Sequence, residues 1–285
     1  MKYRFISILL LVLLIMFPEN LVSQEASVAD KDEVLFNNYV EQIAPFKEAP
    51  LETILEKTAQ FFLGTPYVAH TLDGNGGEAL VVNLRGLDCV TFVENVMALS
   101  FAARSNNLTM DYFKEKLTEI RYRNSEITDY ASRIHYTSDW MFKNQKNNLL
   151  ENISQELSGV KETKRIDFMS THQSAYKQLA NDDALLAKIV QIEENMHDRG
   201  GFYYLPKDRI AEKAKDIPHM AVIGFVTSIE GLDTTHLGFA YHEDGKLTFI
   251  HASSAKMEVV IDTISLSDYC VSQSKCKGII VAKVM

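Results

Sequence analysis

One short stretch decides the fold of this chain: GLDCVTFV, residues 86–93. Asp88 is a favoured residue at a helix N-cap, because its carboxylate can accept hydrogen bonds from the N–H groups of the first helical turn. From Cys89 to about Arg104 the apolar residues recur at helical spacing, so we expect a helix over 89–104. Cys89 then occupies the first position of that helix.

A cysteine at the start of a helix has the surroundings of a nucleophile. The positive end of the helix dipole favours the thiolate, and the free N–H groups there can donate to a developing oxyanion. The chain has three cysteines, of which Cys270 and Cys276 lie close in sequence. Those two either pair as a disulfide in an oxidising compartment or stay as reduced thiols, and in both cases Cys89 is left over. The alternative for Cys89 is a small residue buried in the core.

Two downstream histidines can be placed by the register of a hairpin. We expect two strands joined by a two-residue turn at Asp244-Gly245. Counting back from that turn puts Gly238 opposite His251, so His236 and His251 share one face of the sheet as diagonal neighbours, about 7–8 Å apart by Cα. One imidazole can then take the thiol proton, while the other imidazole holds the first ring in the correct tautomer. We assign His236 as the base and His251 as its orienting partner.

Tyr67 is a further candidate, because it follows a Gly-x-Pro turn upstream of Cys89 and its phenol can donate to an oxyanion. The alternative for Tyr67 is a packed aromatic ring. His242 shares the face of His236 but lies about 20 Å along the strand, which excludes it. The sequence has no His-Glu-x-x-His helix, no paired Cys-x-x-Cys and no Gly-rich phosphate loop in the right context. We therefore expect neither a metal nor a cofactor.

The first 23 residues have the pattern of a secretory signal peptide, with Lys2 and Arg4 ahead of an apolar run over 5–17. The alternative is an uncleaved N-terminal anchor, although the run is short for a membrane span. Residues 1–23 carry Lys2, Arg4 and Glu19, a net +1, so their removal changes the formal charge from −9 to −10. This acidic balance argues against nucleic acid and anionic membranes as partners. We expect an exported protein, periplasmic or extracellular, without stable membrane insertion after cleavage.

The remaining pattern predicts an α+β fold with a single catalytic domain over 24–285. After a polar linker over 24–31, helices are expected over 33–43, 51–63, 89–104, 112–122 and 182–195. Strands are expected over 220–227, 235–241, 247–252, 257–261 and 278–284. Helices followed by antiparallel strands are typical of an α+β arrangement. The part between the nucleophile helix and the sheet, about 109–215, is expected to be a large and mostly helical insertion, with a polar surface segment over 143–160.

Four motifs resemble those of NlpC-type cell-wall cysteine hydrolases: GTPY at 64–67, LDCVTFV at 87–93, THLGFA at 235–240 and FIHASS at 249–254. Members of that superfamily have a reduced papain-like α+β fold, in which the nucleophile helix packs on the sheet, and they cut amide bonds in bacterial peptidoglycan. Their motif order implies Tyr67, Cys89, His236 and His251 as the site residues. One departure is that Val90-Thr91 replaces the common Ser-Gly after the cysteine.

Within that superfamily the sequence is most similar to the N-acetylmuramoyl-L-alanine amidase-like branch. The likeness lies in IRYR at 120–123, SRIHYTSDW at 132–140 and EGLDTTH at 230–236, and with them the resemblance covers nearly all of the mature chain. The branch implies cleavage between the lactyl group of N-acetylmuramic acid and L-alanine. Arg133, Asp139 and Trp140 are candidates for binding the glycopeptide, with a structural role as the alternative.

The resemblance therefore implies a peptidoglycan amidase in which Cys89 forms an acyl-enzyme and His236 transfers protons. Its substrate would be peptidoglycan or a smaller muropeptide. Three alternatives remain: a stem-peptide endopeptidase that cuts the γ-D-glutamyl bond with the same residues, a non-catalytic cell-wall binding module, and a general papain-like protease.

Overall fold

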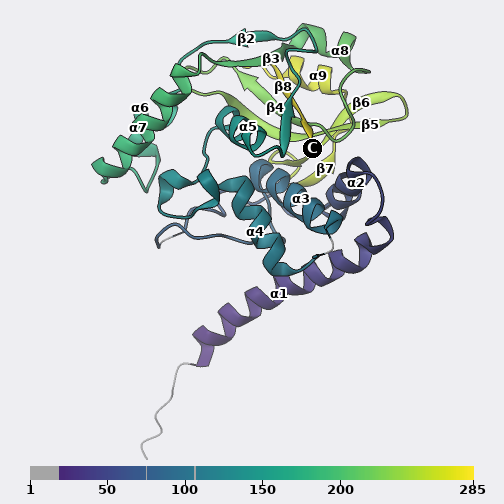
Figure 1. Cartoon of the computed structure of the whole chain (residues 1–285), viewed down its shortest axis with the longest axis vertical. Helices are drawn as coiled ribbons and strands as arrows, with labels where there is room; N and C mark the ends of the chain where they lie inside the picture. The colour runs from purple at the N-terminus through teal and green to yellow at the C-terminus, as the bar shows by residue number, and fades with distance from the viewer. Residues whose placement is uncertain (1–18, 75, 106) are drawn as a thin grey trace, which may run out of the picture.

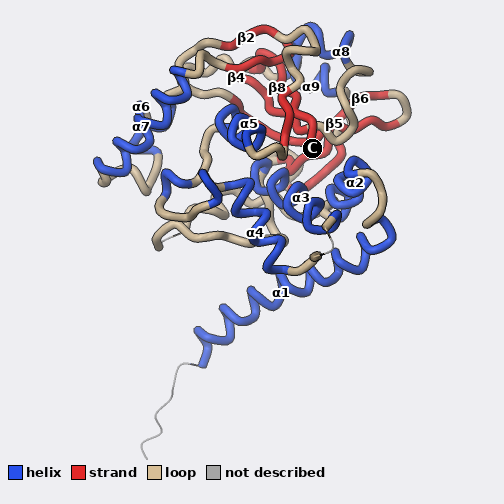
Figure 2. The backbone as a smooth tube through the Cα atoms, in the orientation of Figure 1, coloured by secondary structure: helices blue, strands red, loops and turns tan. Residues whose placement is uncertain are grey.

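The computed structural model describes residues 19–74, 76–105 and 107–285, and it has a layer of helices packed on one antiparallel sheet (Figure 1). Figure 2 shows the strands gathered in the upper part of the molecule, with helices α2, α3 and α4 below them. The predicted α+β arrangement is confirmed, with helices first and most strands later.

Eight strands form the sheet, in the order β2-β3-β8-β4-β5-β6-β7, and β1 pairs with β8 beside that path. All of these pairings are antiparallel. The strands are β1 Leu150–Asn152, β2 Val160–Glu162, β3 Phe202–Pro206, β4 Val222–Thr227, β5 Thr234–Glu243, β6 Lys246–Ser253, β7 Glu258–Ile261 and β8 Cys276–Val284.

Helix α3, Cys89–Arg104, which begins at the candidate nucleophile, is surrounded by other elements of the fold. Helices α2 and α4 and strands β5 and β6 all contact it, so most of its residues are buried. A helix surrounded in this way is apolar on nearly every face. The other helices are α1 Glu19–Ile43, α2 Leu51–Phe61, α4 Met110–Arg121, α5 Thr137–Lys146, α6 Phe168–Thr171, α7 Asp183–Asp198, α8 Ile210–Lys213 and α9 Leu266–Ser272, with short 3₁₀ turns between several of them.

The sheet separates two apolar cores. On the face towards α3, alternate strand residues such as Val222, Leu237 and Ile280 join the larger core. On the opposite face, Phe225 and Phe249 pack with residues of α8 and α9. This alternation follows from the two-residue period of a strand, which sends successive side chains to opposite faces.

The segment 109–215, which we expected to be a mostly helical insertion, contains more helix than strand and also contributes strands to the sheet. Its strands β1 and β3 pair with β8, and β2 extends the sheet beyond β3. The expectation of a polar surface segment over 143–160 is also corrected, because Leu150, Ile153 and Leu157 are buried. Strands of three residues, such as β1 and β2, are too short to produce a recognisable alternation.

Two expectations concern the N-terminal region. Helix α1 begins at Glu19 and runs through the stretch 24–31, which we expected as a polar linker. Positions 1–18 of the predicted signal peptide lie outside the described residues. In the part of the chain that the structure describes, no helix combines the length and the apolar character that a membrane span requires.

The C-terminal cysteines join helix α9 to the sheet. Cys270 in α9 forms a disulfide with Cys276 at the start of β8, and their Cα atoms lie 5.7 Å apart. Of the two states that the sequence left open, the structure has the bonded one. Cys89 is the free cysteine.

Candidate active site

The position of Cys89 is set by the cap of helix α3. The Asp88 carboxylate accepts hydrogen bonds from the backbone N–H groups of Val90 (3.1 Å) and Thr91 (2.8 Å), and the Thr91 hydroxyl accepts one from the Asp88 N–H at 2.9 Å. These reciprocal bonds form a capping box. They confirm Asp88 as the N-cap and Cys89 as the first helical residue.

The surroundings of Cys89 favour the neutral thiol. Burial raises the pKa of the Cys89 thiol to about 12, and the Asp88 carboxylate acts in the same direction. The backbone N–H groups of Leu237, Cys89 and Val90 lower this pKa, but by less than burial raises it. The helix N-terminus therefore acts as the sequence predicted, while desolvation of the charged form outweighs it. The stabilisation of the thiolate that we expected from the helix N-terminus is therefore present, but it is smaller than the opposing effect of burial on the pKa of the thiol.

The hairpin of β5 and β6 has the predicted register. Glu243 pairs with Lys246, and the ladder continues to Phe239 opposite Ile250. Gly238, the next residue along β5, leaves the room that a ring needs. A Cβ built on it would lie 2.8 Å from the Ile250 carbonyl oxygen and 3.0 Å from the Cβ of His251. Only glycine fits at this close approach.

The structure brings His236 and His251 into direct contact. His236 Nε2 lies 2.6 Å from His251 Nδ1, and the two rings are nearly perpendicular at 86°. The Cys89 sulfur lies against strand β5 at the residue after His236, since the backbone N–H of Leu237 donates to it. The start of helix α3 therefore meets strand β5 next to the position of His236.

Asp262 extends the histidine pair to a third group. His251 Nε2 lies 3.4 Å from Asp262 Oδ2. The other carboxylate oxygen, Oδ1, accepts a hydrogen bond from the Ile264 N–H at 3.1 Å, and the Thr248 hydroxyl donates to the Asp262 carbonyl oxygen at 2.7 Å. The carboxylate is therefore held in place, with Oδ2 facing the ring of His251.

This chain of contacts assigns the tautomers of both rings. A carboxylate can only accept, so His251 carries its proton on Nε2, and its Nδ1 is an acceptor. His236 then donates from Nε2 and keeps an unprotonated Nδ1. Burial lowers the pKa of His236 to about 3 and that of His251 to about 4, so both rings are neutral at pH 7. Nδ1 of His236 is thus the basic atom of the site.

Two tyrosines complete the surroundings of the thiol. Tyr67 follows α2 and forms a parallel bridge with Leu87, just before the cap of α3. Burial raises the pKa of its phenol, and the nearby Cys89 and Asp88 act in the same direction. Tyr269, from α9, lies against the rings of both histidines, with centroids 6.5 Å from His236 and 6.0 Å from His251. Tyr67 was predicted from the sequence and Tyr269 was not.

A family model described as N-acetylmuramoyl-L-alanine amidase-like (AmiA-like) matches residues 57–279, a range that includes Tyr67, Cys89, both histidines and Asp262. The chain belongs to this amidase-like family. No match was found among curated proteins.

Solved structures agree with this assignment. An N-acetylmuramoyl-L-alanine amidase from Bacteroides uniformis is 35% identical with a TM-score of 0.76, and the match covers 81% of this chain and 98% of that chain. A further amidase structure from the same organism is 33% identical with a TM-score of 0.75, covering 82% and 99%. The Legionella pneumophila protein LPG0564 shares the fold, with a TM-score of 0.69 and 24% identity. That match covers 91% of this chain and 96% of the Legionella chain.

Arg133 of this amidase-like chain holds the loop that precedes Cys89. Its guanidinium lies 3.3 Å from Glu78 and 3.4 Å from Asp73, and it stacks over the ring of Tyr130 at 5.0 Å. Only 6% of Arg133 is exposed. These contacts account for the residue as a structural one.

Asp139 and Trp140, the other two predicted ligand-binding residues, lie inside the protein. The Asp139 carboxylate is 2.6 Å from both Arg123 and Arg199, and its side chain is 1% exposed. Trp140 is part of the larger core. Neither side chain has a free surface, so the contacts favour the structural alternative for both. Within the described residues, no group of three or more His, Cys, Asp or Glu side chains has the arrangement of a metal site.

Proposed function

We propose that this chain is a cysteine-dependent peptidoglycan hydrolase that cleaves the amide bond between N-acetylmuramic acid and L-alanine. Membership of the amidase-like family supports the substrate class. The observation that carries the mechanism is the Cys89 thiol beside the ordered chain His236–His251–Asp262. A nucleophile, a base and groups that orient the base are the components of covalent acyl transfer. The same arrangement supports placing the chain in the papain-like NlpC superfamily.

The first step forms an acyl-enzyme. His236 Nδ1 removes the proton from Cys89 as the sulfur attacks the amide carbonyl carbon. Because the resting pair is a neutral thiol and a neutral imidazole, proton transfer accompanies the attack instead of preceding it. The Cys89 N–H, at the start of α3, and the Tyr67 hydroxyl donate to the oxyanion. The C–N bond then breaks, and His236 returns the proton to the departing L-alanine nitrogen.

The second step releases the sugar. The lactyl group is held as a thioester on Cys89, and water attacks its carbonyl carbon while His236 Nδ1 accepts a proton from that water. The C–S bond breaks and the thiolate takes the proton back. The products are a stem peptide with a free amino terminus and an amino sugar with a free carboxylate. Protonated His236 is stabilised by His251, which is itself supported by Asp262.

Purified muropeptides, incubated with the protein and resolved by mass spectrometry, test this function. We expect a free stem peptide beginning with L-alanine together with the bare amino sugar, and no product from folded Cys89→Ala. Shortened stems still attached to the sugar would instead identify an endopeptidase. Absence of cleavage by folded wild-type protein would favour a binding module, and activity retained in Cys89→Ala would overturn the mechanism.

The pattern at residues 1–23 supports export of this hydrolase to the compartment that contains its substrate. Accumulation in the periplasm or medium, with loss of the first residues seen by mass spectrometry, is the expected result.

A further inference from the structure

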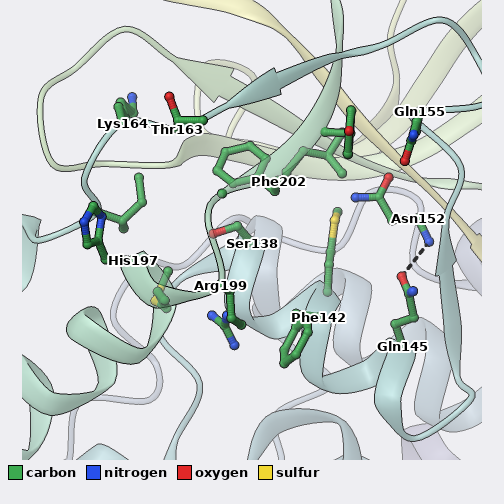
Figure 3. A pocket seen from close by; sticks show the side chains of 16 residues that line it. Ser138, Phe142, Gln145, Asn152, Gln155, Thr163, Lys164, His197, Arg199 and Phe202 are labelled. Atoms are coloured by element: carbon green, nitrogen blue, oxygen red, sulfur yellow. Dashed lines mark hydrogen bonds between the residues drawn. The ribbon is translucent and has the colours of Figure 1, made fainter.

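A cavity of about 270 Å³ lies apart from the proposed catalytic residues. Its walls come mainly from α5, from the end of α7, and from the segments that contain β1, β2 and β3. All of these elements belong to the segment 109–215. Figure 3 shows the side chains that surround this space. None of Tyr67, Cys89, His236, His251 or Asp262 belongs to these walls.

The cavity and the catalytic cysteine lie on opposite sides of α5. Ile280, in the cavity wall, pairs with Gly224, and Gly224 pairs with Leu237, whose N–H contacts Cys89. Two strand spacings put Ile280 about 10 Å from Leu237. Between them α5 sits close on β4, since a Cβ at Gly224 would meet Met141 and Thr137 at 3.3 Å. The cavity is therefore a separate site near the catalytic one.

The walls of this cavity have a distinct chemistry. Among the described residues that line it there is no Asp or Glu, although the chain as a whole has a net charge of −9. Apolar and aromatic side chains, including Phe142 and Phe202, form much of the surface. The amides of Gln145, Asn152 and Gln155 gather on one side, and Lys164 and His197 lie on the other (Figure 3). An occupant would need a hydrogen-bonding end, a flat apolar face and a negative end.

Arg199 gives the cavity a fixed positive group. Its guanidinium stacks 4.2 Å over the Phe142 ring, and one of its nitrogens contacts Asp139 at 2.6 Å. The same Asp139 carboxylate also binds Arg123 at 2.6 Å. Two guanidiniums share one carboxylate, so the cluster keeps one net positive charge. A stacked, held guanidinium has further donors available in a geometry that suits a carboxylate.

We propose that this cavity is a second ligand site, which binds a carboxylate carried on an acetamido sugar. The Arg199 side binds the carboxylate, Phe142 and Phe202 contact the ring, and the amide group binds the hydroxyl and acetamido substituents. The choice of N-acetylmuramic acid as the occupant rests on the proposed function, because the proposed reaction releases this sugar with a free carboxylate. The preference for a carboxylated ring rests on the cavity alone.

Calorimetric titration of Cys89→Ala with N-acetylmuramic acid tests the proposal without any catalytic turnover. N-acetylglucosamine is the matched probe that lacks the lactyl carboxylate, and we expect it to bind at least about tenfold more weakly. Two further variants are made in the same background. Thr163→Phe fills the cavity from an exposed wall position, and Arg199→Gln removes the fixed charge. Each is expected to weaken N-acetylmuramic acid binding by about tenfold or more, while Arg104→Gln, an exposed charge at the end of α3, leaves it unchanged.

Each outcome decides the question. Equal affinity for both sugars, or N-acetylmuramic acid binding that Thr163→Phe leaves unchanged, would overturn the proposal; the second result would place the sugar elsewhere, including the catalytic cleft. Circular dichroism confirms that each variant is folded, and Arg199→Lys keeps the positive charge if Arg199→Gln does not fold. Hydrolysis is measured separately on the wild type. If the protein binds the sugar as expected but cleaves no muropeptide, the second ligand site is supported and the proposed function is refuted.

Discussion

The contact between Asp262 and His251 makes a sharp prediction for Asp262→Asn. In the wild type, Asp262 Oδ1 accepts the Ile264 N–H, and Oδ2 faces His251 Nε2. An asparagine keeps its oxygen on that N–H, because an amide nitrogen cannot accept a hydrogen bond. Its NH₂ group is then directed at His251 Nε2. We expect His251 to move its proton to Nδ1 and donate to His236, which must then carry its own proton on Nδ1 and cease to be a base.

The size of the loss in kcat follows from the hydrogen bonds that the variant must give up to keep His236 Nδ1 unprotonated. To restore an unprotonated His236 Nδ1, the variant must place the His251 Nε2–H against the asparagine NH₂. Two buried donors without acceptors cost about 2 kcal/mol each, about 4 kcal/mol in total, which corresponds to a loss in kcat of about a thousandfold. A wrong histidine tautomer in a catalytic triad has a comparable cost, about ten-thousandfold.

Steady-state hydrolysis of a muropeptide, with Asp262→Ala as the matched control, measures this loss. The alanine removes the acceptor without adding a donor, so we expect a smaller loss, about ten- to a hundredfold. Imidazole ¹⁵N shifts report the tautomers directly and would not change if Asp262 had only a structural role. The reasoning is refuted if Asp262→Asn keeps more than about a tenth of wild-type kcat, if it is no worse than Asp262→Ala, or if the ring tautomers are unchanged.

Three further predictions concern pH, the disulfide and a buried ion pair. Burial lowers the pKa of His236 to about 3, so kcat should persist below pH 6 and fall only as the pH approaches that value; an acid limb near pH 6.5 would contradict this. His236 binds a proton more readily in the unfolded chain than in the folded protein. The free energy of unfolding, measured by urea titration, should therefore decrease as the pH falls from about 6.5 towards 3. Replacing Cys270 and Cys276 together by serine opens a short loop and should lower the free energy of unfolding by about 2 kcal/mol in denaturant titrations. The change should also lower kcat, because α9 carries Tyr269, which packs against His251. An unchanged kcat would show that α9 does not contribute to the active site. Arg121→Met leaves Glu94 buried without its partner at 2.7 Å, so it should lower stability by about 3–5 kcal/mol. A loss under about 1 kcal/mol in denaturant unfolding would contradict this and show that Glu94 becomes protonated or finds another partner.

Much of the site could be predicted because it depends on local geometry. The Asp88 cap needs only residues within one turn of Cys89, and the contact of His236 with His251 follows from a hairpin whose turn is visible in the sequence. Asp262 was missed because it lies past the end of the next strand. A signal was available: β7 pairs with β6, with Val260 opposite His251, so Asp262 is a diagonal neighbour of that histidine. Extending the register by one strand would have found it.

Other features had no local signal. Tyr269 reaches the histidines because a disulfide and an apolar core hold α9 against the sheet, contacts that no spacing in the sequence predicts. The short strands β1 and β2 carry too few residues to show a period. Asp139 and Trp140 were candidates for ligand binding because they lie in a stretch that resembles the amidase-like branch, with a structural role as the alternative. Packing places both side chains inside the protein, which favours that alternative.

The sequence alone determined where helix α3 begins, which residues cap it, and how the histidine hairpin pairs, because each depends on hydrogen bonds between residues near in the chain. Only the tertiary structure decided the direction in which the pKa of the Cys89 thiol is shifted. The helix N-terminus stabilises the thiolate locally, but the pKa also depends on how much water the surrounding elements exclude, and that is set by β5 and the rest of the fold. Desolvation is a property of everything packed around a group, so no stretch of sequence contains it.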